Sequence, residues 1–553
     1  MQNIVIIGGS AGGAGTAARL RRLDETAKIT LVERGAHLSP AHCGFASCIG
    51  GVVNDPCSLL MRSPEGFREH YGAHVMLRCE VTGLNREAKT ISGISRENGD
   101  FFSLPYDKLV IATGSAPVLP SIQGIDDPRI FMLRSYEDML AIRTAIQSSR
   151  VRRAIVVGGG CVGLEAAESL ARRGVITGLA EASDHLLPEL DADMAKFAVL
   201  ALEQHGVALG IGTYVTSVED AGEQGLRVRF SDGPDAFADI VVIAAGVHPE
   251  TALAQQAGIV IGPSGGIVVD ECQRTSDGNI WAVGDAAEVK GALGRTVAAY
   301  ASAAARQAHV AADSICGIPS RYEGTLGVFS LALFDTQIGS VGFSEARLKA
   351  ASIPYEKVFT RAASRAAYYP GANDIVVKLL FDPRSGIVLG AQLAGGSGVD
   401  RRIDVLATAI RAGFTAEDLC GLELCSAPLF GAAKDVVNLA GYAAQNVVRG
   451  LSRIIHWQDA LRTGRLLLDV RTSKEYAAGT LPGAINIPIE TLRDRLQELP
   501  ENNTVLCFSG TGERGYSAER ILRQHGRDAV NLSGGYALYQ IFSQGDQNGH
   551  GKG

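Results

Sequence analysis

The 553-residue sequence lacks the features of a membrane, secreted or nucleic-acid-binding protein. It contains no run of about 18 or more apolar residues, so we expect no segment to cross a membrane. The N-terminus MQNIVIIGGSAGG has neither the charged leader nor the cleavage site of a signal peptide. Lys and Arg form no dense block and the net charge is -7, which argues against a nucleic-acid partner.

Cysteine occurs at ten positions, but without the paired spacings of a disulfide framework. In a reducing compartment most such cysteines are free and buried, and the exceptions are catalytic. We therefore expect a cytoplasmic protein. Its 46% hydrophobic and 20% charged residues are typical of a globular chain. The length predicts about three to five domains, and only the terminal SQGDQNGHGKG is expected to be disordered.

Two segments repeat one pattern of strand, glycine-rich turn, helix and strand. The first runs from NIVIIG (3–8) to ITLVE, which ends at Glu33. The second runs from RAIVVG (153–158) to ITGLAE, which ends at Glu181. An acidic residue about 20 residues beyond the turn is typical of a dinucleotide-binding βαβ unit. The sequence therefore predicts an α/β fold with two Rossmann-like domains.

The glycines of the two turns indicate what the turns bind. Gly8 allows a tight turn, and Gly13 lets the helix pack on the strand, so that the helix N–H groups can meet a pyrophosphate. Ser10 replaces the middle glycine of the first turn, whereas the second, GGGCVG, is complete. We expect Glu33 and Glu181 to accept hydrogen bonds from ribose hydroxyls. A carboxylate at Glu181 would repel a 2′-phosphate, which predicts a preference for NADH over NADPH.

Three later motifs complete a larger pattern, namely KLVIATGSAP, DIVVIAAGVHPE and TSDGNIWAVGDA. An Ala-rich helix is predicted after them, at 297–312. Over residues 1–445 the pattern resembles the pyridine nucleotide-disulfide oxidoreductase family. The resemblance implies that the first fold binds FAD, that the second binds NADH and that Asp285 bonds the ribityl chain of the flavin. The cofactor-binding residues that it implies are Gly8, Ala11, Gly12, Gly13, Glu33, Arg34, Val81, Thr113, Gly114, Asp285, Gly158, Gly160, Val162, Gly163, Glu181 and Gly246.

The same resemblance implies the domain organisation. FAD-binding parts are expected at 1–115 and 246–325, with the NAD-binding domain nested between them at 116–245. An α+β dimerisation domain, with a helix expected at 403–412, should occupy 326–447. It implies a homodimer with both active sites built across the interface. We predict no metal site.

The segment SPAHCGFASCIGG stands where this family keeps its redox sulfur. CoA-disulfide reductases, and the related NADH oxidases and peroxidases, have one cysteine before a glycine here, which matches Cys43 and Gly44. A helix start beside a flavin would favour the thiolate of Cys43. Cys48 adds a Cys-x4-Cys spacing that other family members use for an internal disulfide, although such a bridge would need a distorted helix.

The resemblance to CoA-disulfide reductases also suggests substrate-binding residues, with CoA as a possible ligand. The candidates for binding CoA phosphates are Arg19, Arg22 and Ser39, and more weakly Arg306 and Arg401. Tyr368 and Tyr369 match a place where an aromatic hydroxyl lies beside the reactive sulfur. His42 stands where an Asn is usual. A second expected tyrosine is missing, since Cys425, Ser426 and Phe430 occupy that region.

Residues 456–545 resemble a rhodanese domain, through DVRTSKEYAAGTLPGAINIP and FSGTGERG. A rhodanese carries sulfane sulfur on a cysteine that opens a loop of backbone N–H groups. Here Ser509 occupies that position and Arg514 follows in the loop. A hydroxyl cannot form a persulfide. Cys507, two residues earlier, is expected to be buried in a strand. The domain is thus inactive and binds an anion or a partner, or the serine is engineered.

Together these patterns predict an FAD-dependent reductase that passes electrons from NADH through Cys43 to a disulfide, persulfide or polysulfide, with a CoA-linked substrate favoured. One alternative is an NADH oxidase or peroxidase that uses a Cys43 sulfenic acid. Another is a reductase of a different disulfide that uses a Cys43–Cys48 pair. The rhodanese part could also be a sulfur-sensing or delivery module without catalysis.

Overall fold

The structure, a computed structural model, describes residues 2–148, 150–461 and 464–543. The chain divides into two compact units, Met1–Asp184 with Leu202–Gly327 and His185–Ala201 with Val328–Gly553. The predicted disorder of the C-terminal tail concerns residues 544–553, which lie outside this description. No helix in the described ranges has both the length and the apolar character needed to cross a membrane.

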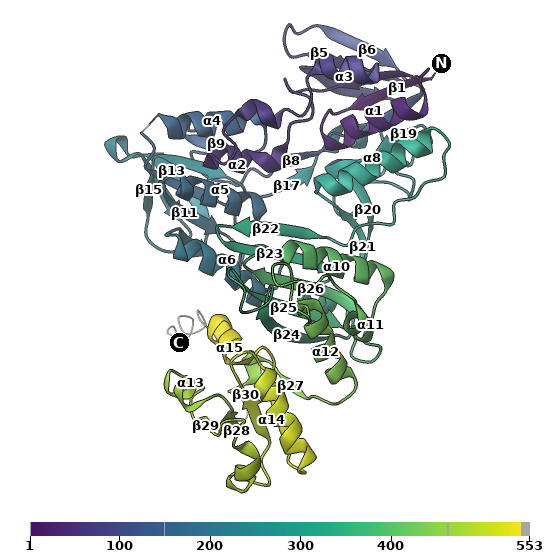
Figure 1. Ribbon diagram of the computed structural model, residues 1–553. Helices are drawn as coiled ribbons and strands as arrows, with labels where there is room; N and C mark the ends of the chain where they lie inside the picture. The colour runs from purple at the N-terminus through teal and green to yellow at the C-terminus, as the bar shows by residue number, and fades with distance from the viewer. Residues whose placement is uncertain (1, 149, 462–463, 544–553) are drawn as a thin grey trace. The chain divides into compact units, whose positions relative to one another are not determined.

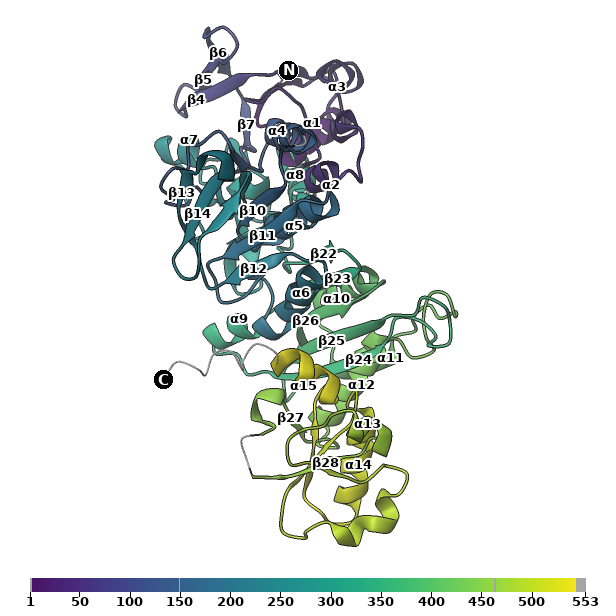
Figure 2. The same cartoon turned by 90° about the vertical axis from the view of Figure 1, so that its left-hand side faces the viewer.

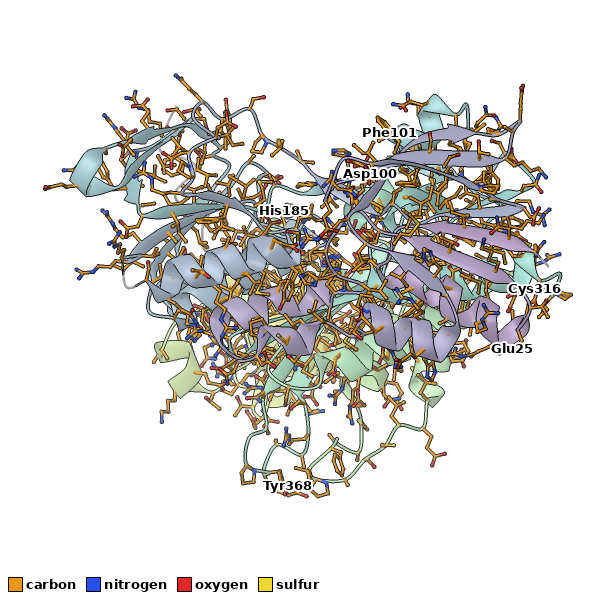
Figure 3. All side chains as sticks on the ribbon, turned by 90° about the horizontal axis from the view of Figure 1, so that it is seen from above. Glu25, Asp100, Phe101, His185, Cys316 and Tyr368 are labelled. Carbon is orange, nitrogen blue, oxygen red and sulfur yellow. The ribbon has the colours of Figure 1, made fainter. Side chains whose placement is uncertain are left out.

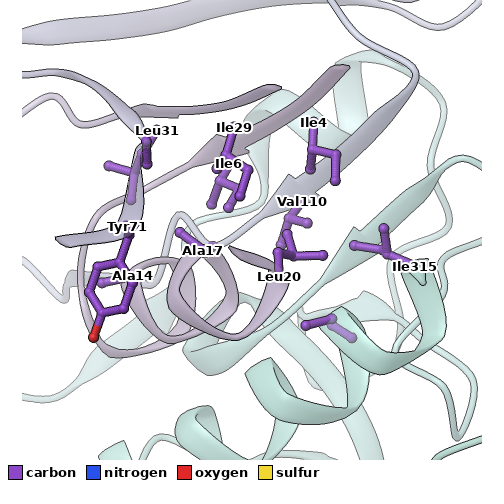
Figure 4. Close-up of a cluster of buried hydrophobic side chains, with 14 of the residues drawn as sticks. Ile4, Ile6, Ala14, Ala17, Leu20, Ile29, Leu31, Tyr71, Val110 and Ile315 are labelled. Atoms are coloured by element: carbon purple, nitrogen blue, oxygen red, sulfur yellow. The ribbon is translucent and has the colours of Figure 1, made fainter. Parts of the chain in front are cut away.

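The first unit contains a five-stranded parallel sheet in the order β19-β7-β1-β2-β3. Side chains of β1 alternate between its two faces, as a strand requires. Ile4 and Ile6 join a buried cluster with Leu20 and Ile315 of the helices α1 and α8, which lie side by side (Figures 1 and 4). Val5 and Ile7 join a separate cluster. The elements are β1 (Asn3–Ile7), α1 (Ala11–Leu23), β2 (Lys28–Val32), β3 (His74–Met76), β7 (Lys108–Ile111), β19 (Ile280–Ala282) and α8 (Ala301–Ile315).

A second parallel sheet, in the order β12-β11-β10-β16-β9, repeats this arrangement in the same unit. Two short strands, β8 (Ser115–Pro117) and β17 (Val247–Pro249), form an antiparallel pair. The chain enters the second fold after β8 and leaves it before β17. The elements of the second fold are β9 (Ile130–Met132), α4 (Tyr136–Gln147), β10 (Arg153–Val157), α5 (Cys161–Arg172), β11 (Ile176–Glu181), β12 (Ala208–Ile211) and β16 (Ile240–Ile243).

Smaller sheets and short helices complete the first unit. Those that bear on the site are the turn η1 (His42–Gly44), helix α2 (Phe45–Gly50) and the turn η2 (Pro56–Leu59). The remaining elements are α3 (Pro64–Tyr71), β4 (Cys79–Asn85), β5 (Thr90–Ser95), β6 (Phe101–Pro105), β13 (Val215–Asp220), β14 (Leu226–Phe230), β15 (Ala236–Ala238), α7 (Ala252–Gln256), β18 (Ile267–Val268), β20 (Ala287–Gly291) and β21 (Gly294–Val297).

The second unit contains an antiparallel sheet in the order β22-β23-β26-β25-β24. Its strands and helices are β22 (Phe329–Leu333), β23 (Thr336–Gly342), α9 (Glu345–Ala350), β24 (Glu356–Ala363), β25 (Asp374–Phe381), β26 (Val388–Gly395), α10 (Val399–Ala412), α11 (Ala416–Gly421) and α12 (Val436–Val448). Residues of α6 (Ala192–Gln204) contact this sheet through Asp193, which accepts a hydrogen bond from Lys378 of β25.

A parallel sheet in the order β27-β31-β30-β28-β29 forms the C-terminal part of the second unit. Its elements are β27 (Ile454–Ile455), β28 (Leu466–Asp469), α13 (Ser473–Ala477), β29 (Ile485–Asn486), β30 (Val505–Phe508), α14 (Glu513–Gln524), β31 (Ala529–Leu532) and α15 (Gly535–Ser543). The predicted α/β fold class, with two Rossmann-type folds, an α+β part and a C-terminal α/β part, is confirmed.

Two predicted helices have different limits in the structure. The Ala-rich helix expected at 297–312 begins only at Ala301, because Val297 is the last residue of β21 and pairs with Glu288. The helix expected at 403–412 begins earlier, at Val399. Its first turn contains Val399 and Arg402, both of which are buried.

Candidate active site

The first glycine-rich turn has a shape that only glycine permits. Gly8 has a φ of 101°, and a Cβ there would lie 2.1 Å from the carbonyl oxygen of Ala112. A Cβ on Gly13 would lie 1.8 Å from the carbonyl oxygen of Gly8. Helix α1, which begins at Ala11, therefore packs directly on β1, and the unpaired N–H groups of its first turn remain available to an anion.

The second turn repeats this geometry. Gly158 has a φ of 114°, and a Cβ on Gly163 would lie 1.9 Å from the carbonyl oxygen of Gly158. A Cβ on Gly160 would meet no atom within 4 Å, so the N-terminus of α5 is open on that side. Val162 beside it is 47% exposed, which is high for an aliphatic side chain next to a sheet. Both turns thus fit the phosphates of a dinucleotide.

The strand-end acids are held in the same way in both folds. Glu33 accepts hydrogen bonds of 2.7 Å from the N–H groups of Gly9 and Gly35. Glu181 accepts hydrogen bonds of 2.5 and 2.7 Å from the N–H groups of Gly159 and Ser183. An ionised carboxylate can accept about four hydrogen bonds, so each acid retains capacity for ribose hydroxyls.

Asp285 is the middle residue of the turn η4 (Gly284–Ala286) after β19, and two residues that the sequence analysis did not identify orient it. The hydroxyl of Ser115 donates to Asp285 at 2.8 Å, and Arg134 donates to that hydroxyl at 3.1 Å. Ser115 belongs to the phrase ATGSAP, so a signal for it was present. Arg134 stands in no motif. The residues present fit a flavin nucleotide whose hydroxyls bond to Asp285.

The remaining predicted cofactor residues are dispersed over the first unit. Thr113 donates to the carbonyl of Glu250 at 2.6 Å, and Arg34 lies 3.7 Å from the carboxylate of the same residue. Gly114 and Gly246 have φ angles of 75° and 104°. Val81 is partly buried in β4, and Gly12 lies beside the side chain of Val283. These positions remain predictions for nucleotide contacts.

Cys43 is an exposed, free thiol in the turn η1, directly before α2. The turn is held against η2, because Ala41 donates to the carbonyl of Leu59 at 2.8 Å. The ring of His42 lies 3.5 Å from the hydroxyl of Ser10, within the first glycine turn. The reactive candidate is thus next to the turn predicted to bind the flavin nucleotide.

His42 itself is poorly suited to act as a cation. Burial, followed by the positive charge of Arg134, lowers the pKa of His42 below its ordinary value. The imidazole is therefore mainly neutral at pH 7 and can either donate or accept a hydrogen bond.

Cys48 differs from Cys43 in its exposure to solvent. It is completely buried in α2, and its sulfur accepts a hydrogen bond of 3.1 Å from Arg143. The other guanidinium nitrogen of Arg143 donates to the carbonyl of Asn54 at 2.7 Å. Both cysteines are free thiols. A redox role for Cys48 remains a prediction.

The arginines predicted to bind CoA phosphates already have partners within the first unit. Arg19 forms an ion pair with Asp313 at 2.8 Å. Arg22 lies over the ring of Tyr71 at 5.7 Å, and Arg306 lies over Tyr322 at the same distance. Ser39 has a φ of 49° and donates its N–H to the carbonyl of Gly9. Arg22 and Arg306 still have cationic groups without an acidic partner among the described residues.

The other substrate candidates belong to the second unit. Tyr368 is 82% exposed on a projecting loop (Figure 3), and Tyr369 beside it is half-buried. Arg401 lies 3.2 Å from the carboxylate of Asp435. Cys425 and Phe430 are exposed on a second loop.

In the C-terminal domain Ser509 directly follows β30 and opens the predicted loop. It is buried, and its hydroxyl accepts hydrogen bonds of 3.2 Å from the N–H groups of Gly512 and Gly515. Arg514 forms a two-pronged ion pair with Glu475, whose pKa falls to about 2 because of those hydrogen bonds. Burial raises the pKa of Cys507, which lies in β30 as predicted, so its thiol stays protonated.

The paired dinucleotide folds and the exposed thiol beside the first of them define a flavin- and nicotinamide-dependent oxidoreductase. The pattern of the pyridine nucleotide-disulphide oxidoreductases matches residues 2–311, and that of their dimerisation domain matches residues 328–435. The chain belongs to the pyridine nucleotide-disulphide oxidoreductase family, whose members use FAD and NAD(H). A rhodanese-like domain follows at residues 453–541.

Solved structures with both parts are similar to the whole chain. The reduced CoADR-RHD of Bacillus anthracis is 39% identical, with a TM-score of 0.95 and coverage of 98% of both chains. A NAD-dependent persulfide reductase from A. fulgidus is 34% identical, with a TM-score of 0.91 and coverage of 97% of this chain and 99% of that one.

Curated relatives cover the part before the rhodanese-like domain. An NADH oxidase of Methanocaldococcus jannaschii is 31% identical over 81% of this chain and 99% of its own length. A coenzyme A disulfide reductase of Staphylococcus haemolyticus is 30% identical over 81% of this chain and its full length. The predicted family and cofactors are thus confirmed.

Proposed function

We propose that the protein reduces a CoA-linked disulfide or persulfide with electrons from NADH, and that Cys43 is the sulfur that reacts with the substrate. The observation that carries this proposal is the exposed Cys43 thiol in η1, next to the first glycine turn. The similarity to a coenzyme A disulfide reductase and a persulfide reductase supports the substrate class. When bound, FAD would accept a hydride from NADH and supply two electrons to the sulfur.

The protein's own residues determine how the substrate reacts. The Cys43 thiolate attacks one sulfur of the substrate, the sulfur–sulfur bond breaks, and a mixed disulfide forms while a thiol or sulfide leaves. His42 is neutral and can donate or accept a hydrogen bond beside Cys43. Arg22 and Arg306 supply cationic groups for the phosphates of CoA.

The test is a steady-state comparison of NADH oxidation with CoA disulfide, CoA persulfide, polysulfide, glutathione disulfide, peroxide and oxygen. CoA-linked substrates should give the highest catalytic efficiency. Faster turnover of glutathione disulfide than of every CoA-linked substrate would contradict the proposed substrate class.

The likeness to an NADH oxidase supports a second candidate, an NADH oxidase or peroxidase in which the Cys43 thiolate reduces peroxide and becomes a sulfenic acid, and electrons from NADH then return it to the thiolate. In that case NADH is consumed without any added disulfide, in a fixed ratio to the oxygen or peroxide consumed. The comparison of substrates described above separates the two candidate functions, because the assays with oxygen and with peroxide contain no sulfur substrate.

The assembly proposed with this function is a homodimer in the cytoplasm. The match to a dimerisation domain at residues 328–435 supports the dimer. Tyr368 and Tyr369 lie in this region, and in our proposal they reach the Cys43 of the other copy. Ten free cysteines among the described residues agree with a reducing compartment.

We expect NADH to be preferred to NADPH by about tenfold or more, because the fixed carboxylate of Glu181 repels a 2′-phosphate. Glu181→Gln should reduce this preference, since it removes the charge and keeps the side-chain size. Glu33→Gln, the equivalent change in the other turn, is the matched control and should leave the preference unchanged. A higher efficiency with NADPH in the parent protein would refute the assignment.

We expect no thiosulfate sulfurtransferase activity from the C-terminal domain. Ser509 cannot carry a persulfide, and Cys507 is a buried, protonated thiol. Ser509→Cys should create a carrier that gains the mass of one sulfur atom after incubation with thiosulfate. The double variant Ser509→Cys with Cys507→Ser should gain the same mass. Sulfur loading of the parent protein at Cys507 would be the opposite result.

A further inference from the structure

Two loops of the second unit project beyond its antiparallel sheet (Figure 2). The first loop, residues 364–373, connects β24 to β25 and exposes Tyr368. The second loop, residues 422–435, connects α11 to α12 and exposes Cys425 and Phe430. Exposed loop tips keep a fixed position only if the bases of the loops are held.

Each loop is closed at its base by its own hydrogen bonds. In the first loop, the N–H of Ser364 donates to the carbonyl of Asn373 at 2.6 Å, and the N–H of Asn373 donates to the hydroxyl of Ser364 at 3.3 Å. In the second loop, the side-chain amide of Asn438 donates to the carbonyl of Leu422 at 3.0 Å. The same amide accepts a hydrogen bond of 3.1 Å from the N–H of Asp435.

One buried guanidinium group joins the two bases. Nη2 of Arg402, in α10, donates to the carbonyl of Ser364 at 2.7 Å and to the carboxylate of Asp435 at 2.7 Å. Nε of Arg402 donates to the same carboxylate at 3.1 Å, and Nη1 donates to the carbonyl of Gly398 at 2.9 Å. The N–H groups of a guanidinium lie in one plane at fixed angles, so they fix the bases relative to each other.

The burial of this pair, which we call the loop hub (Arg402 with Asp435), makes it a firm connection. Both side chains are buried, and removal of either partner leaves the other charge unpaired in the interior. A second ion pair, Arg361 with Asp374 at 2.8 Å, lies at the ends of the strands that flank the first loop. Its side chains are 30% and 48% exposed, so it should contribute little.

We propose that Arg402 and Asp435 are positioning residues for the sulfur substrate, because they hold the two loops in one arrangement; this inference rests on the proposed function. In that function Tyr368 and Tyr369 of the first loop reach the Cys43 of the other copy. The side chains of the loop hub are buried and act through the loops, not by contact with the substrate.

The experiment uses the flavin-loaded full chain and CoA disulfide. Arg402→Lys keeps the charge beside Asp435 but lacks the planar fork that also reaches the carbonyl of Ser364. It should lower kcat/KM for CoA disulfide by about tenfold and leave the rate of flavin reduction by NADH unchanged.

Two further variants accompany Arg402→Lys. Asp435→Asn removes the charge of the loop hub, keeps the side-chain size and should also lower kcat/KM for CoA disulfide. It tests the loop hub if Arg402→Lys fails to fold. Arg361→Gln is the matched control, because it removes the exposed ion pair beside the first loop. It should leave both rates unchanged.

A double-mutant cycle tests whether Arg402 acts through the first loop. The variant with Tyr368→Phe and Tyr369→Phe should by itself lower kcat/KM for CoA disulfide. Arg402→Lys should then lower it further by less than about twofold, because the hydroxyl groups that the loop hub positions are already absent. Fully additive effects would indicate a structural role and overturn the proposal.

Unchanged kcat/KM in both Arg402→Lys and Asp435→Asn would also overturn the proposal. Equal slowing of flavin reduction and of the reaction with CoA disulfide would have the same meaning. A tyrosine variant with the kcat/KM of the parent protein would instead refute the contact of the first loop with the substrate. That part of the proposed function then fails, and the role of the loop hub fails with it.

Discussion

Cys43→Ser is expected to abolish the reduction of sulfur substrates while NADH still reduces the bound flavin. The loss should be about a thousandfold or more, because a hydroxyl replaces the attacking thiolate and no other exposed thiol is adjacent in η1 or α2. Stopped-flow measurement of flavin reduction by NADH, followed by addition of CoA disulfide, separates the two half-reactions.

Cys48→Ser is the matched control, since it makes the same change five residues along the chain. If Cys48 is a packed thiol bonded to Arg143, this variant keeps most of the activity. Mass spectrometry of the unreduced, denatured chain tests the alternative pair. An internal Cys43–Cys48 bridge removes two hydrogens, whereas a Cys43 mixed disulfide adds the mass of a small thiol. Turnover of any sulfur substrate by Cys43→Ser would exclude Cys43 from the mechanism.

Lys378→Met is expected to destabilise the antiparallel sheet of the second unit by about 3–5 kcal/mol. The buried ammonium group of Lys378 lies 2.9, 2.7 and 2.6 Å from the carboxylates of Asp191, Asp193 and Glu345. Burial acts to lower the pKa of Lys378, but these carboxylates raise it above its ordinary value. Without the ammonium group, three buried carboxylates repel one another.

Hydrogen exchange of the backbone amides of β25 measures this change as a fall in their opening free energy. Lys349→Met is the matched control. Its side chain is 68% exposed and lies 3.7 Å from the same Glu345, so the effect should stay below about 1 kcal/mol. A change of less than 1 kcal/mol in Lys378→Met would contradict the prediction.

The same cluster predicts loss of stability in acid. Burial acts to raise the pKa of Glu345, but the positive charges of Lys378 and Lys357 hold it well below its usual range. A carboxyl group with a lowered folded pKa stabilises the protein above its unfolded pKa of about 4.3. This stabilisation is lost as the pH falls below that value. Lys378→Met should have a smaller loss over the same pH range.

The sequence by itself determined the two nucleotide folds, and it predicted Cys43 as the reactive cysteine. The glycine spacing and strand-end acids are local features, because a tight strand–turn–helix needs glycine at Gly8 and Gly158 whatever surrounds it. The rhodanese-like domain, with Ser509 at the position of its usual cysteine, was likewise predicted from short sequence motifs. The buried position of Cys507 followed from its place in an apolar strand.

Only the tertiary structure decided which side chains meet across elements distant in the sequence. No local pattern pairs Arg143 with Cys48, 95 residues apart, or Ser169 with Ala46, 123 residues apart. The same holds for Lys378 and its three carboxylates. Such contacts arise from the packing of whole elements, whose register is not encoded in either segment alone.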